Sequence, residues 1–353
     1  MRLDLLHPLL TPVVLALAVV AATCGCAGET AETTPEPARP GEEAEGTEPA
    51  AEGYPSATLS NDAVTVKIWL PDAERGYYRG PRFDWSGQIA QATWKDHTFF
   101  GKLRTKDDPT GGDTNASGPA GEFGMAGPQS YEEAEVGRTF LKIGVGRLRK
   151  AEDRKYHFNR EYEIVEPGEW EIERDDDWIE FRQSMSDRGW GYAYTKRLEL
   201  LDEEPGFRIV HTLENTGERE LDTTHYSHNF IRIDDTPIGD GYTVELPFEV
   251  EGQVKPGDGT GVDGNAITFR EPLSGSFFAA LEGFEGAEDN HARVINTKTG
   301  AGVEIDGDAA PVMYNLYAEK TAFCPEPFIG IQLEPGRSKT WTITYTFFEA
   351  EER

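Results

Sequence analysis

Short runs of alternating apolar and polar residues recur along most of the chain, and they constrain its fold more than any other feature. Their apolar positions are rich in β-branched and aromatic residues, which favour strands. The clearest runs cover residues 64–70, 170–173, 179–183, 207–213, 292–296 and 341–348. Turn-forming residues separate the runs, and the chain contains 38 Gly and 22 Pro. Because alternation gives a sheet one buried and one solvated face, the sequence predicts an all-β fold, a large antiparallel β-sandwich in a single domain over residues 54–353.

Two segments interrupt this pattern. Residues 104–129 are rich in Gly, Asp and Pro, and strand-like sequence resumes on both sides. Residues 256–264 have a similar composition over a shorter length. We therefore expect two loops, and a loop as long as the first often lines a functional site.

The first 26 residues have the features of an export signal. Arg2 supplies an early positive charge, and the apolar run 9–22 is too short for a comfortable membrane span. The segment 23–26, Thr-Cys-Gly-Cys, resembles a bacterial lipobox, whose cysteine is lipidated and becomes the first residue of the mature protein. Gly precedes Cys26, which makes Cys26 the candidate lipidation site, with Cys24 or simple secretion as alternatives. We expect an exported bacterial lipoprotein that faces the periplasm or the exterior and contacts the membrane only through its lipid anchor.

The next segment and the overall charge limit the partners. Residues 27–53 contain eight Glu, one Arg and no aromatic residue, so they cannot bury enough apolar surface to fold and should form a disordered acidic linker. The whole chain has a formal net charge of −30. The simpler interpretation of this charge is that it keeps the protein soluble, and as a field it would also repel nucleic acid and anionic lipid and favour a neutral ligand. If Cys26 is lipidated, the folded part keeps Cys324 as its one thiol and forms no internal disulfide.

Two histidines three residues apart, His225 and His228, lie in the segment 223–234. The β-branched and aromatic residues around them, followed by a turn signal at 234–241, predict a strand. Residues three apart in a strand point to opposite faces, so the two rings are poorly placed to share a metal ion. We expect no metal site here and a structural role for His225.

A second candidate group is a carboxylate on a stiffened backbone. Glu326 stands between Pro325 and Pro327, which predetermines the direction of its side chain, although a surface turn could have the same sequence. His228 can give a proton near neutral pH, and Glu326 can take one. Together they are the minimum set for general acid and base catalysis.

At these residues the sequence resembles the galactose mutarotase-like superfamily, which includes the aldose 1-epimerases and the glucose-6-phosphate 1-epimerases. The segment His228–Asp234 is similar to the strand that carries the family's catalytic histidine. The segment Cys324–Pro327, followed by Leu-Glu-Pro-Gly at 333–336 and by Trp341, is similar to the region of its catalytic glutamate. The two motifs occur in the family's order, and the resemblance extends over residues 57–348.

The resemblance implies a β-supersandwich with a sugar-binding cleft on one broad sheet. It also implies interconversion of sugar anomers without a cofactor or metal. Glu326, ionised, would take the proton of the anomeric hydroxyl, and His228, protonated, would donate to the ring oxygen. The substrate would be a hexose or a short glycan.

The segment 76–87 resembles the part of the superfamily that delivers an arginine to sugar hydroxyls. This makes Arg82 a candidate substrate-binding residue, and Trp85 or Tyr78 could stack on a pyranose face. Alternatively, the segment is an edge strand and turn whose aromatic residues belong to the core. The chain departs from the family at 121–124, where Glu122 replaces a histidine that assists at the ring oxygen. We take Glu122 as a second candidate substrate-binding residue.

Three functions are compatible with these features. An epimerase of the aldose 1-epimerase type is the first. A carbohydrate-binding lipoprotein with the same fold and no turnover is the second, and the Glu122 replacement and the acidic linker fit it. Other carbohydrate chemistry on this fold is the third, but it usually comes with additional helical domains.

Overall fold

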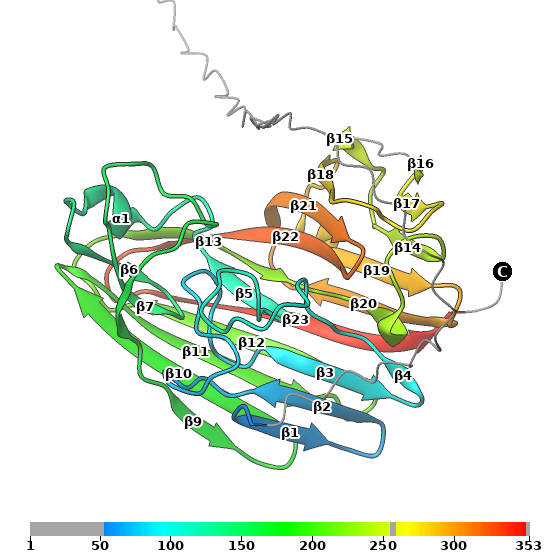
Figure 1. Cartoon of the computed structure of the whole chain (residues 1–353), viewed down its shortest axis with the longest axis horizontal. Coiled ribbons are helices and arrows are strands. Elements are labelled where there is room, and N and C mark those ends of the chain that lie inside the picture. Colours follow the sequence, from blue (N-terminus) through cyan, green and yellow to red (C-terminus); the bar gives the residue numbers. More distant parts are fainter. Residues whose placement is uncertain (1–52, 255–258, 351–353) are drawn as a thin grey trace, which may run out of the picture. The chain divides into compact units, whose positions relative to one another are not determined.

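Nearly all regular structure in the computed structural model is β-strand, arranged in four antiparallel sheets (Figure 1). The structure describes residues 53–254 and 259–350. Within these ranges the helical elements are α1 (Gln129–Glu133) and two 3-10 turns, η1 (Ile233–Asp235) and η2 (Ala287–Asp289). The predicted all-β, antiparallel fold is confirmed.

The largest sheet has ten strands. In spatial order they are β16 (Thr260–Asp263), β17 (Ala266–Phe269), β14 (Tyr242–Glu245), β19 (His291–Asn296), β20 (Ala301–Gly307), β23 (Ser338–Glu349), β12 (Gly206–Asn215), β11 (Trp190–Leu200), β10 (Trp178–Asp187) and β9 (Glu171–Arg174). A two-residue turn joins β10 to β11. Its residues Arg188 and Gly189 both have positive φ, as a type I′ hairpin requires.

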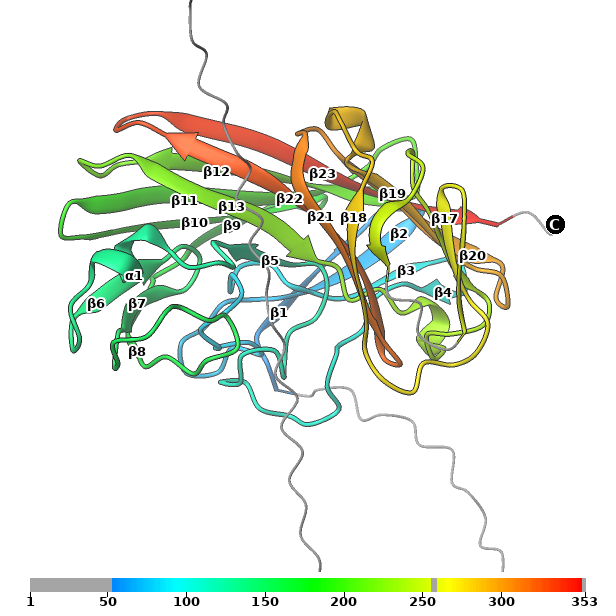
Figure 2. The ribbon, with the colours of Figure 1, turned by 90° about the horizontal axis from the view of Figure 1, so that it is seen from above.

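A six-stranded sheet packs against the large one and carries the site described below (Figure 2). In spatial order its strands are β15 (Glu251–Val254), β18 (Phe277–Glu282), β21 (Pro311–Glu319), β22 (Ala322–Leu333), β13 (Leu221–His228) and β5 (Ala120–Phe123). The long strands β13 and β22 are hydrogen-bonded neighbours, so residues about 100 positions apart in the sequence become cross-strand partners.

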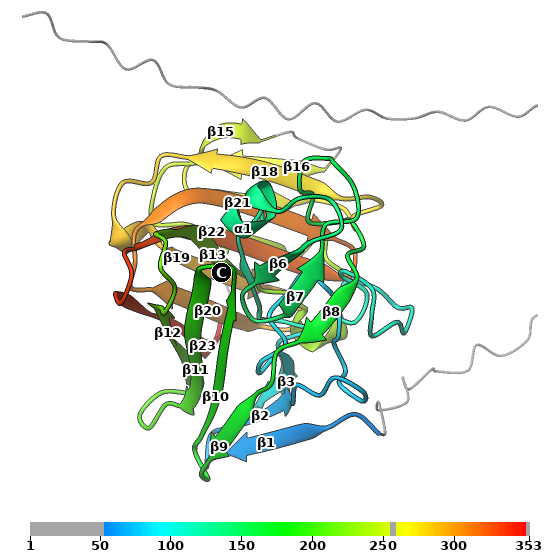
Figure 3. The ribbon, with the colours of Figure 1, turned by 90° about the vertical axis from the view of Figure 1, so that its left-hand side faces the viewer.

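Two smaller sheets lie beside these layers (Figure 3). One contains β1 (Ser56–Ser60), β2 (Val64–Trp69), β3 (Ile89–Trp94) and β4 (His97–Thr98). The other contains β6 (Thr139–Lys142), β7 (Gly146–Arg149) and β8 (Ile164–Pro167). The segment between β7 and β8 contributes side chains to the candidate site.

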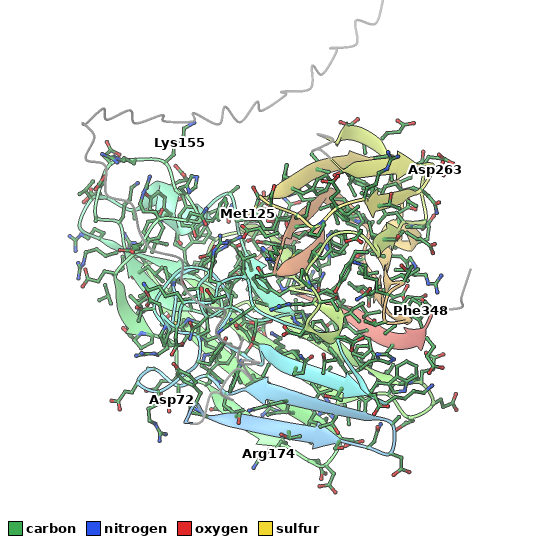
Figure 4. The ribbon with its side chains drawn as sticks, turned by 45° about the vertical axis from the view of Figure 1, so that its right-hand side comes forward. Asp72, Met125, Lys155, Arg174, Asp263 and Phe348 are labelled. Atoms are coloured by element: carbon green, nitrogen blue, oxygen red, sulfur yellow. The ribbon has the colours of Figure 1, made fainter. Side chains whose placement is uncertain are left out.

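Alternation along the strands builds the core. In β18, buried and exposed residues alternate without exception from Phe277 to Glu282. The cross-strand partners Phe207 of β12 and Tyr345 of β23 stack with ring centroids 4.9 Å apart, a contact that adds roughly 0.2–1 kcal/mol over an alanine pair. By contrast, charged side chains such as Asp72, Arg174 and Asp263 project outward (Figure 4).

The loop expectations hold in part. Residues 104–119 lack named strands and helices, as expected, but β5 forms at 120–123. The expected loop at 256–264 is wrong over Thr260–Asp263, which pair with β17 as the edge strand β16. This strand offers one apolar side chain, Val262, and that side chain is exposed, so the edge strand left almost no hydrophobic signal.

The N-terminal predictions lie outside the described residues. These are the export signal 1–26 with its candidate lipidation site Cys26, and the acidic linker apart from Gly53. In the part of the chain that is described, no helix has the length and apolar character needed to cross a membrane.

Candidate active site

The two residues expected to act as acid and base lie opposite each other on neighbouring strands. His225 of β13 pairs with Ile329 of β22, and continuing this antiparallel register by three residues brings His228 opposite Glu326. The Nε2 atom of His228 lies 3.2 Å from Oε1 of Glu326. The structure thus brings the two candidates into direct contact, while their catalytic roles stay predictions.

Aromatic rings fix the orientation of His228. Phe230 stacks on the imidazole with centroids 4.1 Å apart, and Phe83 approaches its edge at 5.6 Å. Phe230 has a φ of 43°, an uncommon conformation for a bulky residue, which is tolerated where the surrounding structure demands it. The Nδ1 atom of His228 is buried and has no hydrogen-bond partner. One ring nitrogen therefore faces Glu326, and the other has no protein partner.

Burial sets the protonation of this pair. His228 is 4% exposed and Glu326 is 5% exposed. Burial, with Arg82 and Arg104 adding to it, lowers the pKa of His228 well below its usual value. Burial also raises the pKa of Glu326 to about 8; Arg82 opposes this rise and Glu122 reinforces it.

Both shifts oppose the expected protonation states, an ionised Glu326 and a protonated His228, which stay predictions. An ionised Glu326 and a protonated His228 would place two charges in a dry site, and their attraction would have to offset the cost of removing both from water. The 3.2 Å separation fits an ion pair, and it fits equally a hydrogen bond from a carboxylic acid to a neutral imidazole, which is the form that both pKa shifts favour. The pair still holds one proton in total.

Arg82 is held from three sides. Its Nε donates to Oε2 of Glu122 at 2.9 Å, and its Nη2 donates to the hydroxyl of Tyr226 at 3.0 Å. The rings of Phe83 and Phe158 lie against the guanidinium, each 4.4 Å from its carbon. The remaining nitrogen, Nη1, makes a long 3.5 Å contact with Oδ1 of Asn159, so it is the nitrogen most easily freed for a ligand.

Glu122 is completely buried and acts as the counter-ion of this arrangement. Besides Arg82, it accepts the hydroxyl of Tyr226 at 2.7 Å and lies 3.4 Å from Nζ of Lys142. Burial alone would raise the pKa of Glu122, but Arg82 and Lys142 lower it below its usual value. Its position assigns it to holding Arg82; direct contact with substrate stays a prediction that its full burial does not favour.

The other aromatic candidates are structural. Trp85 is buried and its Nε1 donates to the carbonyl of Gly80. Tyr78 is buried and its hydroxyl donates to the carbonyl of Gly112. Neither ring offers an open face for stacking on a sugar, because both side chains are packed in the core.

His225 points to the face of β13 opposite His228, as expected. Its Nδ1 accepts a hydrogen bond from Nε1 of Trp341 at 3.2 Å, and its ring packs against Phe123 and His211. Burial lowers its pKa to about 3, so it stays neutral. These contacts between the two large sheets support the structural role.

Solved structures with a similar fold exist, although no family model and no curated protein matches the sequence. The Slr1438 protein of Synechocystis sp. PCC 6803 matches with a TM-score of 0.53 and 14% identity over 84% of this chain and 96% of that one. A GalM/aldose epimerase homologue from C. elegans matches with a TM-score of 0.51 and 14% identity, over 84% of this chain and all of that one. A proposed aldose 1-epimerase of Escherichia coli K12 matches with a TM-score of 0.50 and 12% identity, over the same shares. The chain has the galactose mutarotase-like fold.

Several residues near the candidate pair were missed in the sequence. Tyr226 and Cys324 each stand two positions from a candidate on the same strand, so the period of two could have identified them. Phe158 lies between β7 and β8, and Arg104 lies in the long loop, where it pairs with Asp113 and Glu319. Loop residues such as these have no periodicity that would assign them to a site.

Proposed function

We propose that this protein is an aldose 1-epimerase that interconverts the α and β anomers of a neutral sugar without a cofactor. The observation that carries the proposal is the 3.2 Å contact between His228 Nε2 and Glu326 Oε1 on a galactose mutarotase-like fold. Opening a pyranose requires a proton to leave the anomeric hydroxyl and another to reach the ring oxygen. Both oxygens are bonded to the same carbon, so an acid and a base that serve them must also be neighbours.

The pair holds one proton and has one free basic site, which is what ring opening requires. In the resting state Glu326 carries the proton and His228 is neutral. Glu326 donates to the ring oxygen while His228 accepts the proton of the anomeric hydroxyl, the bond from the anomeric carbon to the ring oxygen breaks, and the aldehyde forms. After rotation about the C1–C2 bond, the ring hydroxyl attacks the other face of the aldehyde. His228 then protonates the carbonyl oxygen, and Glu326 recovers its proton.

This assignment reverses the roles expected from the family resemblance. The expected arrangement, with the proton on His228, contains the same number of protons but needs two buried charges at rest. Charge separation in our proposal develops only during the reaction, where the sugar oxygens supply new hydrogen bonds. The unpartnered Nδ1 of His228 would allow the ring to bond a substrate hydroxyl as well.

The charges around the pair support a neutral sugar rather than a sugar phosphate. Arg82 is neutralised by Glu122, and Arg104 is neutralised by Asp113 and Glu319. A phosphate would have to compete with these carboxylates for each guanidinium. The formal net charge of −30 adds long-range repulsion.

Substrate entry requires side chains to move. The side chains of His228 and Glu326 are only 5% and 7% exposed, so a hexose cannot reach them in the arrangement described. The residues that cover Arg82 are the half-buried Phe158 and the exposed Asn159, whose Oδ1 makes a 3.5 Å contact with Nη1 of Arg82. Such a long contact at an exposed residue costs little to break.

The second candidate function, sugar binding without turnover, needs the same opening of the site. Polarimetry on freshly dissolved α-glucose and α-galactose separates the two. An epimerase accelerates the approach to the equilibrium rotation in proportion to protein concentration. Binding detected by calorimetry without acceleration would support the binding protein and reject the epimerase.

We also propose export with a lipid anchor at Cys26, on the evidence of residues 1–26 alone. Metabolic labelling with a fatty-acid analogue in a bacterial host tests it. Label should be lost in Cys26→Ser and retained in Cys24→Ser. The opposite result would move the anchor to Cys24, and no label in either parent or variant would favour simple secretion.

A further inference from the structure

A buried thiol lies beside the His228–Glu326 pair. Cys324 precedes Glu326 by two positions in β22, so the two side chains share one face of the strand, and the register places His228 opposite Glu326. One potential ligand atom from each residue (a ring nitrogen, the thiol sulfur and a carboxylate oxygen) lies within 4.8 Å of the other two. All three residues are buried. His225, which we expected not to share a metal with His228, is not part of this group.

We propose that His228, Cys324 and Glu326 form a binding site for a borderline-soft divalent cation of the Zn²⁺ class. Thiolate, imidazole and carboxylate are the three ligand types of zinc in proteins, and three protein ligands with a small ligand such as water in the fourth position are typical of catalytic zinc sites. With ligand bonds of about 2.0–2.3 Å, tetrahedral ligand atoms lie roughly 3.3–3.7 Å apart. The 3.2 Å separation of His228 Nε2 and Glu326 Oε1 lies just below this range, so a small movement of either side chain would accommodate the ion.

Charge balance favours the ion in this buried position. Binding releases the proton of the thiol and any proton on the carboxyl group, as metal ligation in general requires. The resulting thiolate and carboxylate together carry two negative charges, which neutralise a divalent cation. The nearest guanidinium, that of Arg82, has its own counter-ion in Glu122 at 2.9 Å, so it need not compete for Glu326.

A second group, His291, Glu304 and Asp306, has similar spacing but is a weaker candidate. It contains no sulfur, it is partly exposed, and Arg293 lies 3.3 Å from Glu304. It serves as an internal control, because an ion held there would not depend on Cys324.

Occupation of the first site would inhibit the proposed epimerase, since the ion takes the lone pairs of both the acid and the base. This consequence rests on the proposed function, whereas binding of the ion does not. The metal-free protein would be the active form, and binding of zinc would switch it off.

Cobalt spectroscopy tests the site directly. The full chain is prepared with Cys24→Ser and Cys26→Ser, so that Cys324 is its one thiol, then freed of metal with a chelator and titrated with Co²⁺. We expect one equivalent to produce a thiolate-to-cobalt charge-transfer band in the near ultraviolet, which Zn²⁺ then removes by displacement. His291→Asn should leave the band unchanged.

Cys324→Ser in the same background should abolish the band and weaken zinc binding by at least about tenfold. Cys324→Ala provides a second variant if the serine hydroxyl disturbs packing, and circular dichroism confirms that each is folded. The proposal is overturned if stoichiometric Co²⁺ gives no charge-transfer band with the parent protein, or if the band survives in both variants.

The outcome is separable from that of the proposed function. A cobalt band without anomer exchange would retain the metal site and reject the epimerase. Anomer exchange without a cobalt band would do the reverse. If both hold, Zn²⁺ should inhibit the parent protein, and Cys324→Ser should lose zinc sensitivity by a similar factor, measured against its own metal-free rate.

Discussion

Replacing Glu122 by Gln should destabilise the protein by about 3–5 kcal/mol, because it leaves buried cations without a neutralising charge. Arg82 Nε and Lys142 Nζ lie 2.9 and 3.4 Å from the Glu122 carboxylate, and all three side chains are almost fully buried. Gln keeps the volume of the side chain and can still accept the Tyr226 hydroxyl, so the loss comes from charge rather than from a cavity. Burial already lowers the pKa of Lys142, so that residue can release its proton and bring the loss toward the lower end of this range.

Urea unfolding followed by tryptophan fluorescence measures this loss. The matched control is Glu166→Gln, which removes an ion pair with Arg147 whose glutamate side chain is 53% exposed. Exposed pairs contribute less than about 1 kcal/mol, so the control should unfold close to the parent. If Glu122→Gln loses no more stability than the control, the buried counter-ion role of Glu122 is refuted.

Three further predictions follow from the site. With chelator present, activity should depend on pH as a bell-shaped curve. Its basic limb should lie near pH 8, where Glu326 loses its proton, and its acidic limb should lie well below pH 6.5, where His228 gains one. A flat profile from about pH 5 to 9 would reject the shared proton. The raised pKa of Glu326 means that folding takes up a proton between pH 4.5 and about 8, so the free energy of unfolding falls as pH rises through that window. Glu326→Gln should therefore raise Tm at pH 8 and have little effect at pH 4. A Tm at pH 8 below that of the parent would oppose this reasoning. Arg82→Lys should raise KM more than it lowers kcat, because a lysine lacks the guanidinium that donates to Glu122 and Tyr226 at once. If steady-state polarimetry shows an effect on kcat alone, Arg82 has no part in substrate binding.

The strands with clear alternation were predictable, and those without it were not. The run 207–213 falls within β12, and the run 341–348 falls within β23, because a half-buried strand imposes a period of two on its residues. Strand β16 lies at an exposed edge, and its side chains contribute little to the core. Its residues therefore do not alternate between apolar and polar. The sheet order is also not encoded in local periodicity.

The two central residues of the candidate site were predictable, but their burial, protonation and neighbouring charges were not. Each motif indicated one group, His228 or Glu326, and the family resemblance joined them. Their protonation depends on how much water reaches them, which is a property of the loops and sheets that close over the site. The role of Glu122 is similar, since a glutamate at 122 can hold a sugar or an arginine, and only its position between Arg82 and Lys142 separates the two.

Chain geometry explains why Cys324 was overlooked. In the sequence it is an isolated thiol with no partner cysteine and no ligand motif around it. A shared strand face brings it next to Glu326, and cross-strand register adds His228 from almost 100 residues away. A ligand set that spans two strands in this way becomes visible when the pairing of those strands is known.

The most direct test of the account is exchange NMR on equilibrated glucose and galactose at pH 7, with the parent protein and the variants His228→Asn and Glu326→Gln. The parent should transfer magnetisation between the α and β anomeric protons, and each variant should lose at least about a hundredfold in rate. His291→Asn and Glu304→Gln, which change the same residue types outside the site, should exchange at the parent rate. Absence of exchange with the parent, or exchange that persists in both site variants, would contradict catalysis by the His228–Glu326 pair.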